Sequence, residues 1–174
     1  DVLNGGALAD TLTGGSGDDT IAGGQGRDEI TTGDGADRIE IAGGHSGVTL
    51  ESADMILDWS ALDRLVFGGG LVVGGAYAEF SATDPIQAAT QASQAMAAGS
   101  NFVAVQLGAD VLVFVDSANT NVAADGVRLV GRTLADVVAA NFASTSAPPL
   151  QAPGPPPFPS PSTAPIPRLV STLR

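Results

Sequence analysis

A nine-residue period between residues 5 and 40 is the feature that most constrains this chain. Four consecutive units begin at Gly5, Gly14, Gly23 and Thr32, and three of them open with paired glycines. The sixth position of each unit is aspartate, and the eighth is a large aliphatic residue. These residues are Asp10, Asp19, Asp28 and Asp37, and Leu12, Ile21, Ile30 and Ile39. A flexible glycine-rich linker would not hold two residue types in phase four times, so the segment is a structural repeat.

Each part of the unit has a physical use. Glycines allow the positive φ angles of a tight turn, and the remaining residues can form a short strand with one side chain pointing inward. A single unit cannot bury its aliphatic residue, so neighbouring units must stack. Stacking also brings the aspartates together, and carboxylates about 5 Å apart repel by roughly 3 kcal/mol at an effective dielectric near 20. Calcium removes this repulsion with the oxygen ligands it prefers, whereas magnesium demands a more rigid octahedron.

The pattern resembles the RTX repeat of bacterial secreted proteins, G-G-x-G-x-D-x-U-x. The resemblance implies a parallel β-roll in which two units complete one coil, so that alternate aspartates share an edge. Asp10 would then lie with Asp28, and Asp19 with Asp37. It also implies that calcium binds these aspartates together with backbone carbonyls of the stacked turns. The implied carbonyl donors are Gly5, Ala7, Gly24 and Gly26 for the first pair, and Gly14, Ser16, Gly33 and Gly35 for the second.

Three positions depart from this pattern. Leu8 stands where the first unit should have its third glycine, and Thr32 replaces the first glycine of the fourth unit. A fifth unit, from Ile41 to Thr49, keeps an aliphatic residue at Val48 but has Ser46 in place of aspartate. The second and third units are therefore the most regular.

The sequence after the repeats resembles the segment that follows them in many RTX proteins, D-x-I-x-D-[FW]-x-x-x-x-D-x-[IL]. Two short strands fit here, Met55 to Trp59 and Arg64 to Phe67. The resemblance implies that an acid of this segment completes the last calcium site. Asp58 is the preferred candidate, ahead of Asp54 and Asp63. The alternative is that these acids are solvated residues at strand ends.

A helix is predicted from Asp84 to Ala98. Asp84 is a suitable N-cap, Pro85 fits the first turn, and Gly99 can end the helix. One face of small and apolar residues is expected to pack on a sheet. Its members are Ile86, Ala89, Ser93, Met96 and Ala97.

We predict a mainly β fold in three parts. Residues 1–50 form an RTX calcium-binding β-roll, and residues 51–143 form a β-rich C-terminal cap and secretion-associated region. This cap contains the helix at 84–98, and a capping-box-like start at Thr133 predicts a second, short helix to Phe142. Residues 144–174 form a disordered tail, because ten of the 11 prolines fall between Pro148 and Pro167, and proline at this density prevents helix and sheet.

Composition excludes several classes of function. The chain carries 19 acidic residues against seven arginines, with a net charge of −12 and no basic patch, so it is unsuited to nucleic acid or anionic membranes. It has no apolar run of the ~20 residues that span a bilayer, and no cysteine for disulfide or thiol chemistry. With one histidine, no H-E-x-x-H and no G-x-S-x-G in a strand-turn-helix setting, it carries no catalytic constellation.

The resemblance therefore implies a calcium-binding module that is not itself an enzyme. It would fold outside the bacterial cell when calcium binds, and would support type I secretion, stability or surface attachment of a larger protein. Its implied partners are calcium ions, the type I secretion machinery, and the cell surface or a polysaccharide. The alternative is the C-terminal non-catalytic module of a secreted metalloprotease or polysaccharide-active enzyme. The chain starts at Asp1 without a signal peptide, so we expect a piece of a longer protein or a processed form.

Overall fold

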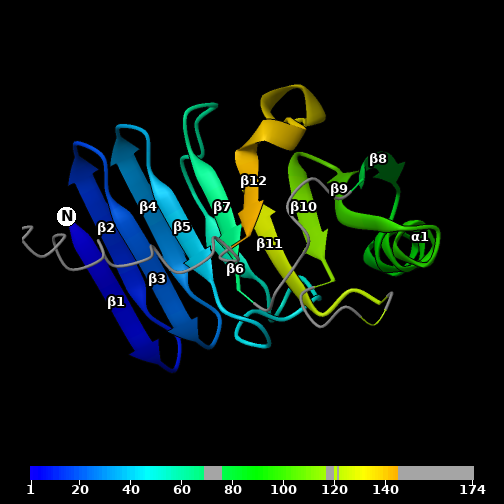
Figure 1. The fold of residues 1–174 in the computed structure, drawn as a ribbon, viewed down its shortest axis with the longest axis horizontal. Coiled ribbons are helices and arrows are strands. Elements are labelled where there is room, and N and C mark those ends of the chain that lie inside the picture. Colours follow the sequence, from blue (N-terminus) through cyan, green and yellow to red (C-terminus); the bar gives the residue numbers. More distant parts are fainter. Residues whose placement is uncertain (69–75, 117–119, 121, 145–174) are drawn as a thin grey trace, which may run out of the picture.

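The computed structural model describes residues 1–68, 76–116, 120 and 122–144, and most of its regular elements are strands in two sheets (Figure 1). Sheet A has the order β1 (Val2–Ala7), β3 (Thr20–Gln25), β5 (Arg38–Ile41), β7 (Arg64–Phe67) and β12 (Phe142–Ser144). Sheet B has the order β2 (Thr11–Ser16), β4 (Glu29–Asp34), β6 (Asp54–Ile56), β11 (Asp125–Leu129), β10 (Asp110–Val115), β9 (Ser100–Leu107) and β8 (Ala76–Ala82). The other elements are the helix α1 (Pro85–Ala97) and the 3-10 turns η1 (Leu134–Asp136) and η2 (Ala139–Asn141).

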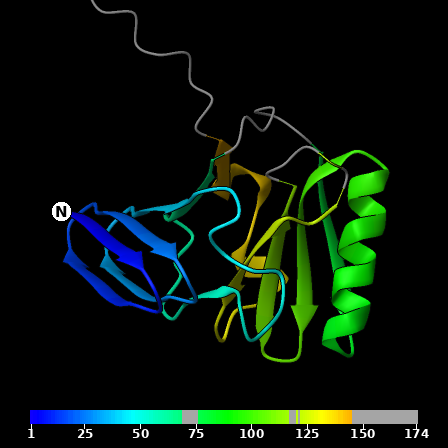
Figure 2. The same cartoon turned by 90° about the horizontal axis from the view of Figure 1, so that it is seen from below.

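The nine-residue period places successive strands in alternate sheets. β1, β3 and β5 pair in parallel in sheet A, while β2 pairs in parallel with β4 in sheet B. Aliphatic residues one coil apart are paired across these strands. Leu3 pairs with Ile21, and Leu12 pairs with Ile30. Figure 2 shows the two sheets as separate layers at the N-terminal end. The predicted parallel β-roll is confirmed.

The inward aliphatic residues of the repeats form the core of the roll. Ile21, Ile30 and Ile39 are fully buried. Leu3 and Leu12 are only partly buried, because β1 and β2 each have a neighbouring strand on one side only. Burial of one such side chain stabilises the fold by about 1.5–3 kcal/mol, so stacked coils are needed to form a core.

The same core continues past residue 50 into the cap. β6 stacks in parallel on β4, and β7 stacks on β5, so both sheets extend without interruption. Trp59 and Phe67 join the repeat isoleucines in one buried cluster with Phe102 and Phe142. The rings of Phe102 and Phe142 are stacked with centroids 5.1 Å apart. The division of the chain near residue 50 stays a prediction, since the hydrophobic core runs across it.

The cap adds an antiparallel ribbon and the helix to sheet B. The strand predicted at Arg64–Phe67 is observed, whereas the strand predicted from Met55 to Trp59 is shorter and ends at Ile56. β10 lies between β9 and β11 and is buried on both faces. One of its faces contributes to the core between the sheets, and the other, with Leu112 and Phe114, packs against α1 (Figure 2).

The ends of α1 agree with the prediction, but its buried face does not. Asp84 caps the helix by accepting a hydrogen bond from Gln87 N at 2.9 Å, and Gly99 follows it with φ +103°. The predicted core face is wrong at Ile86, whose side chain is 80% exposed, and only its member Met96 is buried. The residues buried against sheet B are Ala88, Ala92, Ala95 and Met96. Three alanines let the helix approach the sheet more closely than a face with isoleucine would allow.

The second predicted helix is also wrong. Residues 134–141 form η1 and η2 instead, and Val137 between them is extended with φ −130° and ψ 130°. The capping box at Thr133 is present, but β-branched Val137 is buried in the core and ends the turn. Within the described residues, no helix is long and apolar enough to cross a membrane. The predicted disordered tail falls outside the described residues from residue 145 onward.

Candidate metal centres

Residues with positive φ shape the turns of the roll. The second position of each repeat is left-handed, with φ +103° at Gly6, +109° at Gly15, +100° at Gly24 and +98° at Gly33. The fourth position is left-handed too, and here Leu8, with φ +79°, replaces glycine in the first repeat. A Cβ added at Gly24 or Gly33 would collide with the carbonyl oxygen of Gly6 or Gly15. The turns therefore stack in direct backbone contact, one coil apart.

Aspartates on the first edge are joined through the backbone. Asp10 N donates to Asp28 Oδ1 at 2.9 Å, across 18 residues. Asp28 N donates in the same way to Asp54 Oδ1 at 2.9 Å, now across 26 residues. The next backbone amide, Asp54 N, donates to Ser46 Oγ at 2.9 Å, and Ser46 Oγ in turn donates to Gly126 O. We call this series of backbone-to-carboxylate hydrogen bonds a ladder. It ends at Ser46, the serine at the sixth position of the fifth unit.

Aspartates on the second edge form a matching ladder. Asp19 N donates to Asp37 Oδ1 at 2.8 Å, and Asp37 N donates to Asp63 Oδ1 at 3.2 Å. The last spacing is again longer than in the repeats, because residues 42–53 intervene before β6. The predicted association of Asp10 with Asp28 and of Asp19 with Asp37 is present in the structure. The nine-residue period did not identify Asp54 and Asp63 as the next members of these ladders.

The second carboxylate oxygen of each repeat aspartate has no protein partner. These four atoms are the Oδ2 atoms of Asp10, Asp19, Asp28 and Asp37, each buried and without a hydrogen-bond partner among the described residues. Each of the first three lies against the first glycine of its own repeat, so close that a Cβ on that glycine would clash with it. Leaving such a group unsatisfied costs about 1–3 kcal/mol or more. Carboxylate oxygens without donors, beside stacked carbonyls, fit calcium.

The electrostatics of the ladders also favour a bound cation. Burial raises the pKa of Asp37, and the nearby carboxylates of Asp63, Asp19 and Asp18 raise it further, against the lowering effect of the Asp19 backbone N–H. Burial likewise raises the pKa of Asp54 to about 7, with a further contribution from the Asp28 carboxylate. Each shift means that burial and the neighbouring carboxylates destabilise the negative form. A dication would reverse this effect, since calcium binds the deprotonated carboxylate.

Asp58 and Asp63 are held by protein donors as well. Asp58 Oδ1 accepts from Thr32 N at 2.8 Å, and its Oδ2 accepts from Gly33 N at 2.9 Å. Asp63 Oδ2 accepts from Ser60 N at 2.7 Å, besides the ladder bond to Oδ1. Asp58 therefore caps the turn of the fourth repeat, which sequence reasoning did not foresee. Its role as a calcium ligand stays a prediction.

The acidic groups do not gather into larger clusters. Within the described parts of the chain, no three His, Cys, Asp or Glu side chains come together in a group that could hold a metal. The predicted site in the roll has two carboxylates and completes its coordination with backbone carbonyls, and this ligand set stays a prediction. This composition agrees with the oxygen ligands of calcium.

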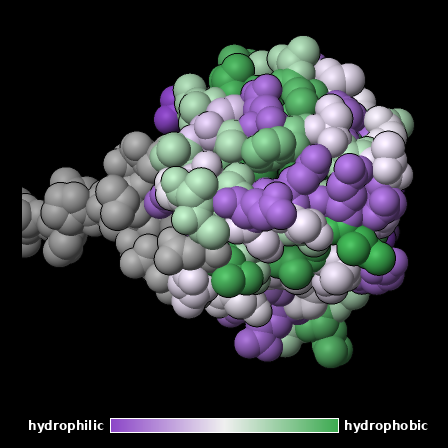
Figure 3. Space-filling model, turned by 90° about the vertical axis from the view of Figure 1, so that its right-hand side faces the viewer, coloured by the Kyte–Doolittle hydropathy of each residue, from purple (hydrophilic) through white to green (hydrophobic). Residues whose placement is uncertain are grey.

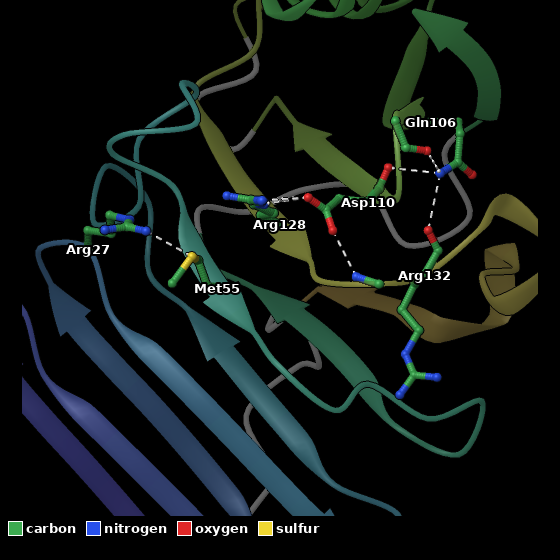
Figure 4. Close-up of polar contacts among 8 residues, drawn as sticks. Arg27, Met55, Gln106, Asp110, Arg128 and Arg132 are labelled. Atoms are coloured by element: carbon green, nitrogen blue, oxygen red, sulfur yellow. Dashed lines mark hydrogen bonds and ion pairs between the residues drawn. The ribbon is translucent and has the colours of Figure 1, made fainter.

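A second polar cluster lies in the cap, and the hydrogen bonds of its Asp110 and Gln106 join residues of the cap to one another (Figure 4). Asp110 Oδ2 accepts from Arg128 Nε at 2.8 Å, and its Oδ1 accepts from Gly131 N at 2.8 Å. The Gln106 amide donates to the carbonyl oxygens of Gly108, Asp110 and Arg132. These contacts connect the turns at one end of the ribbon, so we assign the cluster a structural role.

Comparison with known proteins identifies the repeats. Residues 4–39 match the family model of the RTX calcium-binding nonapeptide repeat, in four copies. Among solved structures, the AlgE6R3 subunit from the Azotobacter vinelandii mannuronan C5-epimerase is similar, with 23% identity over 98% of this chain and 93% of that chain and a TM-score of 0.48. No curated protein matches the chain. The protein therefore carries the calcium-binding repeat of the RTX family, and residues 4–39 fold as its parallel β-roll.

Proposed function

We propose that this chain is a calcium-dependent folding module of a secreted bacterial protein. It folds outside the cell when calcium binds, and it supports type I secretion, stability or surface attachment of the larger protein that contains it. The observation that carries the proposal is the set of four buried Oδ2 atoms, one in each repeat, that have no partner in the described part of the chain. The role is one of binding and folding, and no step of catalysis is assigned to these residues.

Two sites follow from the stacking of the turns. Asp10 and Asp28 form the carboxylate pair of the first site, and Asp19 and Asp37 form that of the second. The proposed carbonyl donors are Gly5, Ala7, Gly24 and Gly26 at the first site, and Gly14, Ser16, Gly33 and Gly35 at the second. Bound calcium would supply the positive charge that offsets the repulsion between stacked carboxylates.

The location of folding follows from the proposed affinity. Repeats rich in glycine lose much conformational entropy on folding and bury only one aliphatic side chain each, so without metal they have little to hold them together. Sites of this extracellular kind bind calcium with dissociation constants of about 10⁻⁴–10⁻³ M. Cytosolic calcium lies far below this range, so the repeats would stay unfolded inside the cell and fold after export.

Circular dichroism of the full chain in chelator and during a calcium titration tests this function. We expect strand content to rise cooperatively as calcium approaches millimolar concentration, because binding and folding of the roll are coupled. Magnesium at the same concentration is the control and should produce little change. Equal strand content in chelator and in millimolar calcium would refute the proposal.

A pair of charge-matched variants separates ligands from general charge effects. Asp37→Ala removes a ladder carboxylate, whereas Asp34→Ala removes the same charge from an exposed side chain of the same repeat. Calorimetry should show loss of one calcium site in Asp37→Ala and an unchanged number of sites in Asp34→Ala. Equal losses in both variants would mean that overall negative charge, and not the ladder, attracts the cation.

A further inference from the structure

A groove on the surface of the cap runs beside α1. It has a volume of about 790 Å³ and lies between the helix and the segment from Val48 to Glu51, with Leu112 in its lining. The helix contributes a stripe of residues to it. These are Pro85, Ile86, Ala89, Thr90, Ser93, Gln94 and Ala97. Figure 3 shows this side of the molecule, where hydrophobic side chains lie between hydrophilic ones.

The stripe gives α1 a second apolar face. The first face, which contains Ala92 and Met96, packs on β9 and β10. A helix that covers a sheet normally presents polar residues on its other side. Here Ile86 is 80% exposed, and Ala89 and Ala97 follow it at helical spacing along the groove. An exposed apolar face of this kind marks a place where another segment docks.

The end of the chain has the pattern of such a segment. Leu169, Val170 and Leu173 follow the spacing i, i+1 and i+4, which places three apolar residues within one side of a helix that starts at Pro167. Polar residues fill the other positions from Arg168 onward, and Pro167 suits a first helical turn. This segment lies outside the described residues. Apolar anchors one turn apart, as Leu169 and Leu173 are, are used by helices that bind in a groove.

Charge and length favour the same occupant. Residues 1–144 carry 19 acidic and five basic residues, whereas residues 145–174 carry two arginines and no acid. Glu51 lines the groove, so an arginine-bearing segment is attracted to it. The 24 residues from 145 to 168 can span up to about 80 Å. This span is several times the radius of gyration, about 15 Å, that is expected for a domain of 144 residues.

We propose that the segment from Pro167 to Leu173 docks in the groove beside α1 as a short amphipathic helix of the same chain. Helices this short are marginal on their own, so the helix forms against the groove. Leu169, Val170 and Leu173 face Ile86 and Leu50, and Arg168 or Arg174 approaches Glu51. The groove lies in the cap, and this docking does not depend on the proposed calcium sites.

Methyl NMR of the full chain in calcium tests the docking, with isoleucine, leucine and valine labelled. We expect nuclear Overhauser contacts between the methyls of Leu169 or Leu173 and those of Ile86. The variant Leu169→Ser/Leu173→Ser should remove these contacts and move the Ile86 signal, while the buried Ile30 and Ile39 signals stay in place. The Ile30 and Ile39 signals report on folding of the roll. A failure of calcium-dependent folding would change these signals, and is thereby distinguished from a failure of docking.

A matched variant is the control for the loss of apolar residues from the tail. Leu150→Ser/Phe158→Ser removes two large apolar side chains outside the proposed segment and should leave the Ile86 signal unchanged. An Ile86 signal that ignores Leu169→Ser/Leu173→Ser would overturn the proposal. Contacts that disappear when the protein is diluted would overturn it too, because the occupant would then be a second copy of the chain.

Discussion

The two oxygens of each ladder aspartate have different tasks. In Asp28 and Asp37, Oδ1 accepts a backbone N–H from the aspartate one coil earlier, and Oδ2 is buried with no donor among the described residues. An asparagine in this position would have to lose one of the two tasks, because its amide nitrogen donates and cannot accept. Aspartate is thus required both to connect the coils and to provide a metal ligand.

The ladder geometry predicts which aspartates are coupled. Asp19→Ala and Asp37→Ala should each remove the same calcium site, so the double variant should lose no more than either single variant. Asp19→Ala combined with Asp28→Ala should lose both sites, because these residues lie on different edges. Calorimetric stoichiometry measures the number of sites, and additivity identifies independent pairs. Strict additivity for Asp19 and Asp37 would contradict the pairing.

Leu8 provides a test of backbone strain in the first repeat. Its φ of +79° places a branched side chain in the left-handed region, and the side chain itself is 80% exposed. The left-handed conformation costs a non-glycine residue roughly 1–2 kcal/mol. Leu8→Gly should therefore raise the free energy of unfolding in saturating calcium by about 1 kcal/mol, measured by urea denaturation. Leu8→Ala keeps the Cβ and is the control, so an equal gain in both variants would exclude strain as the cause.

Asp58, between β6 and β7, caps the turn of the fourth repeat. Asp58→Ala removes the acceptors of the Thr32 and Gly33 amides, and so leaves a donor unpaired in the buried Thr32 and another in the half-buried Gly33. We expect a loss of stability of about 2–4 kcal/mol in urea denaturation. The number of bound calcium ions should stay the same if Asp58 acts only as this cap. A lost site in calorimetry would assign it the ligand role as well.

At the scale of elements, local and repeated sequence patterns were sufficient to predict much of the fold. The nine-residue period predicted the coils and the pairing of Asp10 with Asp28, because every turn repeats the same short-range geometry. The ends of α1 were predictable from Asp84, Pro85 and Gly99 because caps are local. The insertion before β6 breaks the period, so the 26-residue step from Asp28 to Asp54 could not be predicted from it.

The failures share a dependence on tertiary contacts. A capping box correctly marked Thr133, but burial of Val137 and the hydrogen bond from Trp59 Nε1 to Asp136 O at 3.1 Å stop the helix after one turn. Likewise, the spacing of small residues on α1 fits two faces, and only the packing on β9 selects the one with Ala92. Such choices depend on partners far away in the sequence.

At the scale of the whole molecule, one hydrophobic cluster joins the calcium-binding repeats to the end of the described chain. Ile21 and Ile39 from the roll belong to the same cluster as Phe142 from β12. Phe142 is 9% exposed, and its ring lies 5.3 Å from that of Tyr77 and 5.1 Å from that of Phe102. We therefore expect folding of the roll to be coupled to a residue that has no place in either proposed calcium site.

This coupling predicts that a core residue of the cap controls the apparent affinity for calcium. Phe142→Ala should destabilise the fold by about 3–5 kcal/mol. Because binding free energy is spent on folding, the deficit appears as weaker binding. With two ions bound per folding event, the calcium midpoint of the circular dichroism transition should rise by about tenfold or more. Val122→Ala, which truncates an exposed residue outside the groove, is the control and should leave the midpoint in place. An unchanged midpoint in Phe142→Ala would mean that the roll folds independently of the cap, despite the shared core.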